Sequence, residues 1–198
     1  MFAECEDDLG KELLVRILDH VGVEPENWVI NVAGGNGPMR AKIKQWTEVG
    51  RREHVVLLTD LDATRCASGL VASWLGRHPK PIGLHIRVAV RTAESWVLAD
   101  RAAFAKFLAV SPALVPMQPD LEPSPKQRLL QLAEKSPRRR LRADIVAHRH
   151  GQPRQAPNYN AALRPFVAKR WDVSRAAKAS PSLARTLRRL AASLGTRP

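Results

Sequence analysis

Apolar, strand-like runs alternate with helical segments over the first ninety residues, and this alternation constrains the fold more than any other feature. The clearest run, residues 54–59 (HVVLLT), is continuous and rich in β-branched residues, as is typical of a strand buried on both faces. Further strands are expected at residues 2–5, 28–32 and 82–90. Helical periodicity separates them at residues 9–21, 39–49 and 68–75. This order predicts an α/β fold with a mostly parallel four-stranded sheet flanked by helices.

The character of the chain changes after residue 90, where helical periodicity replaces the alternation. We expect the α/β domain to cover residues 1–110, a proline-rich linker residues 111–125, and a basic helical region residues 126–198. Within the last region, helices are expected at residues 127–134, 141–147, 161–171 and 182–194, with a polar loop at 148–160.

Positive charge is concentrated in the C-terminal part of the sequence. Up to Pro123 there are 14 Lys and Arg against 16 Asp and Glu, whereas from Ser124 onward there are 18 against 3. Such an asymmetry is typical of contact with a polyanion, and we expect nucleic acid, DNA rather than RNA. An acidic protein partner is the alternative. The expected phosphate contacts are arginines in two clusters, Arg138, Arg139, Arg140 and Arg142, and Arg185, Arg188 and Arg189.

Acidic residues follow the first and third expected strands, at the edge of the sheet where open α/β folds bind ligands. Glu6 follows the first strand, and Asp60 and Asp62 end the third. In an extended segment residues i and i+2 point to the same side, so this pair is a candidate ligand set for Mg²⁺ or Mn²⁺. Glu94, just past the fourth strand, is a further candidate metal ligand. A helix-capping role is the alternative for Glu94, and a turn-capping role the alternative for the two aspartates.

A glycine-rich segment follows the second expected strand at the same edge. Gly34, Gly35 and Gly37 are expected to form a phosphate loop, because glycine lets the backbone approach a ligand closely with its N–H groups exposed. The segment lacks the Lys-Ser/Thr that follows the glycines of a P-loop, so ATP hydrolysis by this chain is not expected.

A glutamate after the first strand, a glycine loop after the second and DxD after the third together resemble the Toprim domain of topoisomerases, bacterial primases and OLD-type (overcoming lysogenisation defect) nucleases. The resemblance implies that Glu6 is the general acid or base and a candidate metal ligand, and that Asp60 and Asp62 are the metal carboxylates. Members of the family usually have a glycine after the glutamate, where this chain has Asp7, so Glu4 remains an alternative for that role.

Other segments are similar to a group of small stand-alone Toprim-like bacterial proteins: CEDDLGKELLVRIL, RTAESWVLAD and a late NYN…WD…SPSLAR pattern. This similarity spans most of the chain. The resemblance to OLD-type nucleases implies a Mg²⁺-dependent nuclease that works beside an ATPase subunit in bacterial defence against phage.

Two other functions remain open from the residues alone. The string VVLLTDLDAT fits the first motif of haloacid-dehalogenase-type phosphatases, with Asp60 as nucleophile and Asp62 as acid or base. Against it, that motif belongs on a first strand, and no adjacent pair of carboxylates follows Asp62. The second alternative is a catalytically silent nucleic-acid-binding or scaffold module that keeps the fold.

The sequence also bears on location. The N-terminus MFAECEDD lacks the basic start of a signal peptide, and no apolar run approaches the ~20 residues needed to cross a bilayer. We therefore expect a cytoplasmic protein with no membrane association, in which Cys5 and Cys66 stay reduced.

Overall fold

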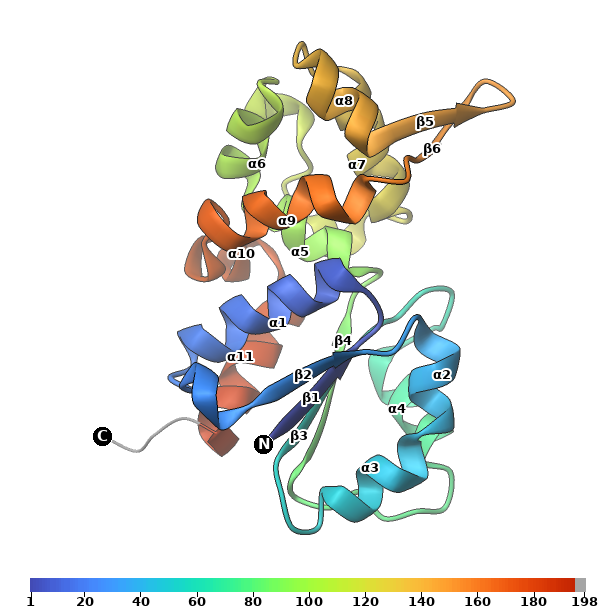
Figure 1. The fold of residues 1–198 in the computed structure, drawn as a ribbon, viewed down its shortest axis with the longest axis vertical. Coiled ribbons are helices and arrows are strands. Elements are labelled where there is room, and N and C mark those ends of the chain that lie inside the picture. Colours follow the sequence, from blue (N-terminus) through green and yellow to red (C-terminus); the bar gives the residue numbers. More distant parts are fainter. Residues whose placement is uncertain (195–198) are drawn as a thin grey trace. The chain divides into compact units, whose positions relative to one another are not determined.

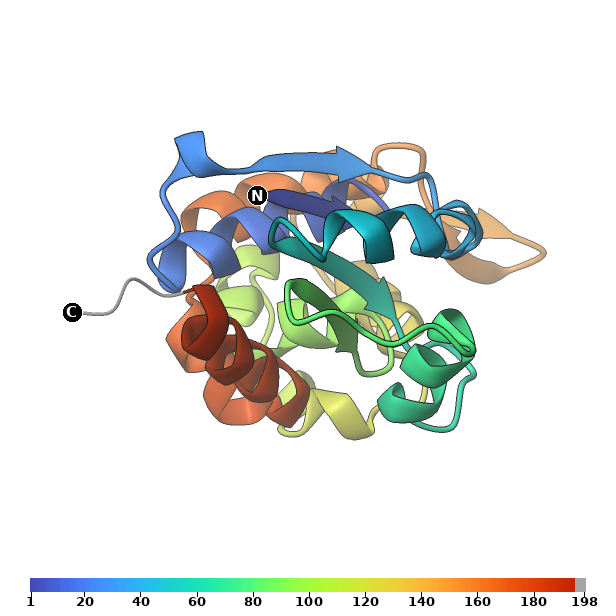
Figure 2. The same ribbon diagram turned by 90° about the horizontal axis from the view of Figure 1, so that it is seen from below.

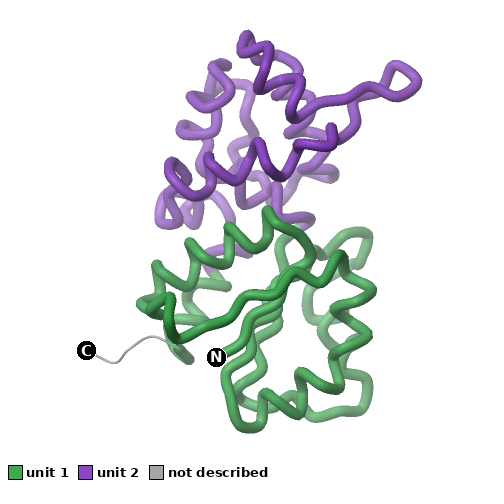
Figure 3. Tube along the Cα trace, in the orientation of Figure 1, with its two compact units in different colours: residues 1–90, 185–198 green, residues 91–184 purple. Residues whose placement is uncertain are grey.

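The computed structural model describes residues 1–194 and divides the chain into two compact units (Figure 3). Unit 1 contains residues 1–90 and the chain from Arg185 onward, and unit 2 contains residues 91–184. The first boundary therefore falls about twenty residues before the end of the domain expected at residue 110. Within residues 1–194, no helix combines the length and apolar character needed to cross a membrane.

Unit 1 is built on a four-stranded sheet in which every pair of neighbouring strands is parallel (Figure 1). Its strands are β1 (Phe2–Cys5), β2 (Val29–Val32), β3 (Val55–Asp60) and β4 (Leu84–Ala89), in the order β2-β1-β3-β4. The first five residues of β3 are all buried, as the continuous apolar run predicts. The expected α/β class, with a four-stranded parallel sheet flanked by helices, is confirmed.

Helices cover both faces of this sheet (Figures 1 and 2). One face is covered by α2 (Asn36–Ala41), α3 (Ile43–Val49) and α4 (Ala67–Leu75), and Leu57 of β3 shares a core with Trp46 and Trp74 from these helices. The opposite face carries α1 (Asp8–His20), which packs so closely on β1 that a Cβ atom at Gly10 would lie 3.2 Å from that of Cys5. A short 3₁₀ turn, η1 (Pro25–Asn27), precedes β2.

The helix expected at residues 39–49 begins earlier and is divided in two. Lys42 has ψ of 3°, away from helical geometry, and separates α2 from α3. Because α2 already begins at Asn36, Gly37 lies inside a helix and only Gly34 and Gly35 form a loop.

Unit 2 is mainly helical. Every residue of its first helix, α5 (Ala93–Ala99), is buried. The other helices are α6 (Arg101–Leu108), α7 (Pro125–Glu134), α8 (Arg139–Ile145), α9 (Tyr159–Lys169), α10 (Val173–Ala179) and the first residues of α11 (Pro181–Leu194). The expected C-terminal helical region is therefore present. It also contains an antiparallel hairpin, β5 (Val146–Arg149) and β6 (Gln152–Gln155). Residues 146 and 147 were expected to end a helix, and the rest of the hairpin was expected to be a loop. His150 and Gly151 both have positive φ, the backbone of a tight hairpin turn.

The proline-rich segment 111–125, which the sequence suggested was a linker, lies inside unit 2. Its prolines begin two 3₁₀ turns, η2 (Pro112–Leu114) and η3 (Pro119–Leu121). Arg101 donates a hydrogen bond to the Val115 carbonyl (2.9 Å), and the backbone N–H of Ser182 donates to Asp120 (2.8 Å). These contacts tie the segment to helices on both sides of it in the sequence, so it is a packed part of the unit.

Candidate active site

The order of the strands creates a topological switch point between β1 and β3. These two strands are neighbours at the centre of the sheet, yet the helices that follow them, α1 and α4, lie on opposite faces (Figures 1 and 2). Open α/β sheets bind ligands at such a switch point, outside the carboxyl ends of the strands. Glu6 directly follows β1 and Asp60 is the last residue of β3, so the topology brings both to this switch point.

Glu6 is held against the end of β3 by one of its two carboxylate oxygens. Its Oε1 accepts hydrogen bonds from the Thr59 hydroxyl (2.6 Å) and from the backbone N–H of Asp60 (2.9 Å). In the described part of the chain Oε2 accepts no hydrogen bond, and the residue is only half-buried. One oxygen therefore fixes the orientation of the side chain, while the other remains available to a ligand.

Thr59 and Asn36 contribute side chains to this site and were not identified from the sequence. Thr59 donates its hydroxyl proton to Glu6 and accepts a hydrogen bond from the Asn36 side chain (3.3 Å). The backbone N–H of Gly34 donates to the Glu6 carbonyl (3.1 Å). The glycine segment thus lies beside the acidic residues, as expected. The period-2 pattern of β3 gave the signal for Thr59: residues 55, 57 and 59 share one side of the strand.

Of the three glycines of the expected phosphate loop, two have a backbone conformation that favours glycine. Gly34 and Gly35 have φ of 78° and 128°, a region that other residues rarely adopt, and a Cβ on either would meet open space. Gly37 does not have positive φ. The left-handed backbone needed for close approach to a phosphate is therefore limited to Gly34 and Gly35.

Glu4, the alternative to Glu6, has a different environment. It lies within β1, is fully buried, and uses both oxygens inside the protein: the Lys42 ammonium is 2.7 Å from Oε1, and the Trp46 indole N–H donates to Oε2 at 2.7 Å. These contacts join β1 to α3. Neither oxygen of Glu4 is available at the edge of the sheet, so the geometry favours Glu6 as the acidic residue of the site.

Asp60 and Asp62 do not lie on one continuous extended segment. The strand ends at Asp60, Leu61 turns into the core and donates its N–H to the Ala89 carbonyl (2.9 Å), and Asp62 has φ of 50°. The same-side geometry expected of residues i and i+2 in a strand therefore does not apply. Within residues 1–194, no three His, Cys, Asp or Glu side chains are grouped so that they could share a metal ion. The structure brings Glu6 and Asp60 together, but does not group Asp62 with them.

Glu94 lies in unit 2 and is 2% exposed. Its Oε2 accepts from the Thr92 hydroxyl (2.6 Å), and its Oε1 accepts from the Tyr159 hydroxyl (2.9 Å) and lies 3.5 Å from the Lys126 ammonium. Thr92 does not cap α5 with its side chain, so the expected capping alternative is not what is observed. Both oxygens of Glu94 are occupied by protein donors, which points to a buried structural carboxylate.

We expect Tyr159→Phe to lower the free energy of unfolding by about 1.5–3 kcal/mol, because it removes a hydrogen bond to a buried, charged group. Urea unfolding followed by circular dichroism measures this loss. Phe166→Leu, a core change on the same helix that removes no hydrogen bond, is the matched control. A Tyr159→Phe variant as stable as the wild type would show that the Glu94 contact contributes nothing to the fold.

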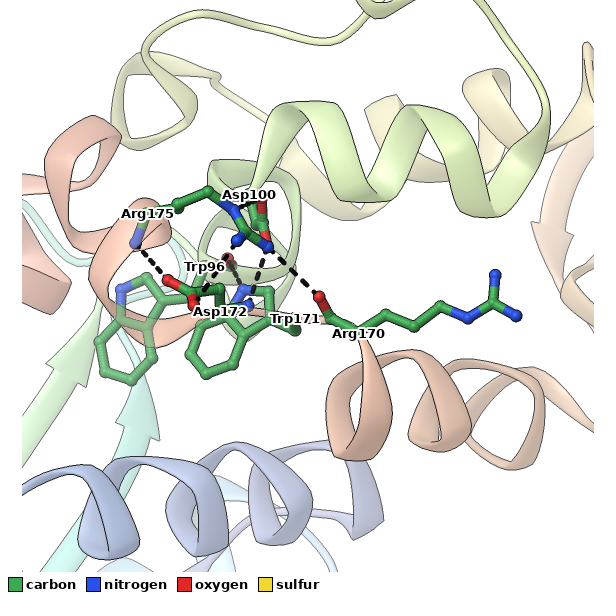
Figure 4. A network of polar contacts seen from close by, with 6 residues as sticks. All are labelled: Trp96, Asp100, Arg170, Trp171, Asp172 and Arg175. Carbon is green, nitrogen blue, oxygen red and sulfur yellow. Dashed lines mark hydrogen bonds and ion pairs between the residues drawn. The ribbon is translucent and has the colours of Figure 1, made fainter.

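The segments RTAESWVLAD and NYN…WD…SPSLAR meet in unit 2. Tyr159 of NYN reaches Glu94, and the Trp96 indole donates to the Ser182 hydroxyl of SPSLAR (2.7 Å). Figure 4 shows the third contact, in which Arg175 makes a two-pronged ion pair with Asp100 (2.8 and 3.1 Å). There the Trp171 indole also donates to the Trp96 carbonyl (2.8 Å). These motifs therefore form one network around α5, which the partly exposed Arg175, between WD and SPSLAR, joins through Asp100.

No protein-family model matches this chain, and no curated protein or solved structure matches it either. The functional argument therefore rests on the residues and contacts of the chain itself.

The arginines expected to contact nucleic acid are on the surface of both units. Arg138, Arg139 and Arg140 begin α8 of unit 2, and their exposed side chains have no ion-pair partner in residues 1–194. Arg142 is half-buried and donates to the Ser136 carbonyl (3.0 Å), which fixes the start of the same helix. The second cluster is exposed on the part of α11 that belongs to unit 1: Arg185, Arg188 and Arg189.

Proposed function

We propose that unit 1 is a Toprim-like nuclease domain that hydrolyses nucleic-acid phosphodiesters, DNA rather than RNA, with the help of Mg²⁺ or Mn²⁺. The observation that carries this proposal is the Glu6 carboxylate, which is fixed against Asp60 at the switch point of the sheet and keeps one oxygen available. By resemblance to OLD-type nucleases, the proposal extends to a cytoplasmic protein that works beside an ATPase subunit in bacterial defence against phage.

The residues present fit a hydrated Mg²⁺ ion. Magnesium commonly takes only one or two protein carboxylates, and water and substrate phosphate complete its ligand shell. Glu6 and Asp60 would hold it, whereas Asp62 lies in the following turn and is not grouped with them. A bound ion would neutralise charge on the phosphodiester and lower the pKa of a bound water.

The protein's own groups would orient the reacting parts. Thr59 and the Asp60 N–H hold Glu6 in one position, as required of a general acid or base. Gly34 and Gly35 give the adjoining backbone an open, left-handed path along which a phosphate can approach. The exposed arginines of α8 and α11 would contact phosphates farther along the strand.

The second candidate function is a catalytically silent nucleic-acid-binding module. The observation that favours it is that Asp62 is not grouped with Glu6 and Asp60, so that the described residues include no three-ligand metal site. A module of this kind would bind DNA through its arginines, and its affinity would fall steeply with salt.

Incubation of the full chain with supercoiled plasmid and Mg²⁺ or Mn²⁺ tests the proposal. We expect metal-dependent nicking, and we expect Asp60→Asn to reduce its rate at least 100-fold, because the change removes a charged metal ligand. Asp19→Asn is the matched control: Asp19 is an exposed acid at the end of α1 that forms an ion pair with Arg16 at 3.7 Å. Nicking should be unchanged in this control.

The outcomes separate the candidates. Salt-sensitive plasmid binding without cleavage, under every divalent metal tried, would favour the silent module. Equal nicking by wild type and Asp60→Asn would contradict the nuclease proposal. Hydrolysis of a small phosphomonoester that depends on Asp60 would instead support the haloacid-dehalogenase-type reading.

A further inference from the structure

A pocket lies in unit 1, where the last described turns of α11 pass beside the amino end of β4. Its volume is about 360 Å³, within the range of small-ligand sites. We call it the basic pocket, because three of its lining residues are Lys80, Arg87 and Arg189. His85, Ile82 and Ser193 also line it.

The basic pocket contains three cations and no carboxylate. None of Lys80, Arg87 and Arg189 has an ion-pair partner in residues 1–194. The Nε of Arg87 is buried and makes no hydrogen bond in the same part of the chain. A buried donor without a partner costs about 1–3 kcal/mol, and more when it is charged. The arrangement is therefore unfavourable unless an anion is present.

The pKa values of the basic groups in this pocket are lowered, as expected of buried cations close together. Burial, and then repulsion from Arg189, lower the pKa of Arg87 to about 10. Burial, and then repulsion from Arg87 and Arg189, lower the pKa of Lys80. Burial is also the main cause that lowers the pKa of His85 to about 4, so this ring, which lies 3.2 Å from the His54 ring nitrogen, is neutral at pH 7. The shifts of Arg87 and Lys80 both arise from burial next to other cations, which a bound anion would offset.

We propose that the basic pocket binds a phosphate group, with Arg87 at its base and Lys80 and Arg189 on its sides. Guanidinium groups match the oxygens of phosphate in spacing and direction, and three cations suit a doubly charged phosphomonoester better than a single carboxylate. The Ser193 hydroxyl is a further donor, and the exposed Ile82 adds apolar surface at the rim of the pocket.

The basic pocket is separate from the acidic site. Lys80 and Ile82 precede β4, at the amino edge of the sheet, whereas Glu6 and Asp60 lie at the carboxyl edge. None of the residues that line the pocket belongs to the acidic site, although Arg87 pairs with Leu58 of β3, two residues before Asp60. The inference uses different residues and does not rest on the nuclease proposal.

Isothermal titration of the full chain with inorganic phosphate, in EDTA buffer without divalent metal, tests the inference. We expect Arg87→Gln to weaken phosphate binding at least tenfold. Arg77→Gln is the matched control, because Arg77 is an exposed arginine three residues before Lys80 and outside the pocket. Arg189→Gln, at an exposed position, should also weaken binding and tests the pocket even if the Arg87 variant folds poorly.

A second arm identifies the source of the phosphate. A 5′-phosphorylated oligonucleotide that binds at least tenfold more tightly than its 5′-hydroxyl form, with the preference lost in Arg87→Gln, indicates the end of a nucleic-acid strand. Phosphate binding without this preference indicates a free phosphate ester. Failure of wild type to bind phosphate, or an equal loss in Arg77→Gln, would overturn the proposal.

Discussion

Glu6→Gln is expected to reduce metal-dependent cleavage at least 100-fold while leaving the protein folded. The amide oxygen of glutamine can still accept the hydrogen bonds from Thr59 and the Asp60 N–H, so the side chain should keep its position. What the change removes is the negative charge on the available oxygen, and with it both metal affinity and acid–base function. General acid or base groups typically contribute 10²–10⁴-fold to a rate. Nicking rates, normalised to the folded fraction by circular dichroism, measure the effect.

Glu4→Gln is the matched control for this experiment, because it makes the same chemical change two residues away on the same side of β1. We expect it to lower stability by about 1–3 kcal/mol, since an amide N–H would face Lys42 or Trp46 in place of a buried carboxylate oxygen. Lys42 is 45% exposed and can turn toward water, which limits the loss. Cleavage per folded molecule should stay at the wild-type rate. The opposite result, in which Glu4→Gln abolishes cleavage and Glu6→Gln does not, would move the acidic role to Glu4.

The sheet could be predicted from the sequence because its strands are encoded by local pattern. Residues 55–59 are apolar or β-branched and buried on both faces, so this continuous local pattern was enough to identify β3. The hairpin β5–β6 was missed because residues 148–155 (HRHGQPRQ), which make up most of it, have the polar composition of a loop. It is formed by the turn at His150 and Gly151 and by tertiary packing, and neither leaves a periodic signal.

The acidic site could be predicted only in part, for a related reason. The ends of the two apolar runs placed Glu6 and Asp60 at one edge, and parallel pairing made them neighbours. The i, i+2 rule for extended segments fails for Asp62, because Asp62 itself has a left-handed backbone after the strand ends. The separation of Glu94 into another unit, with Tyr159 and Lys126 as partners, depends on contacts between residues more than thirty positions apart. Sequence spacing does not encode such contacts.

Trp96→Ala is expected to cause the largest loss of stability, about 3–5 kcal/mol, which is typical of removing a fully buried tryptophan. The change leaves a cavity beside α5 and removes the indole that donates to Ser182. Because a domain is stable by only about 5–15 kcal/mol in total, a substantial part of unit 2 should unfold at low denaturant. Urea unfolding monitored by circular dichroism measures the shift.

Trp28→Ala is the matched control, because Trp28 is only half-buried and its indole makes one long hydrogen bond to Val23 (3.4 Å). We expect a loss of less than about 2 kcal/mol there, as for residues outside the core. Equal losses in the two variants would contradict the view that the Trp96–Ser182–Trp171 contacts hold unit 2 together. If Trp96→Ala instead stays folded but loses DNA binding or cleavage, then RTAESWVLAD is a functional motif. In that case the acidic edge of unit 1 is not sufficient for activity, and Glu94 returns as a candidate ligand.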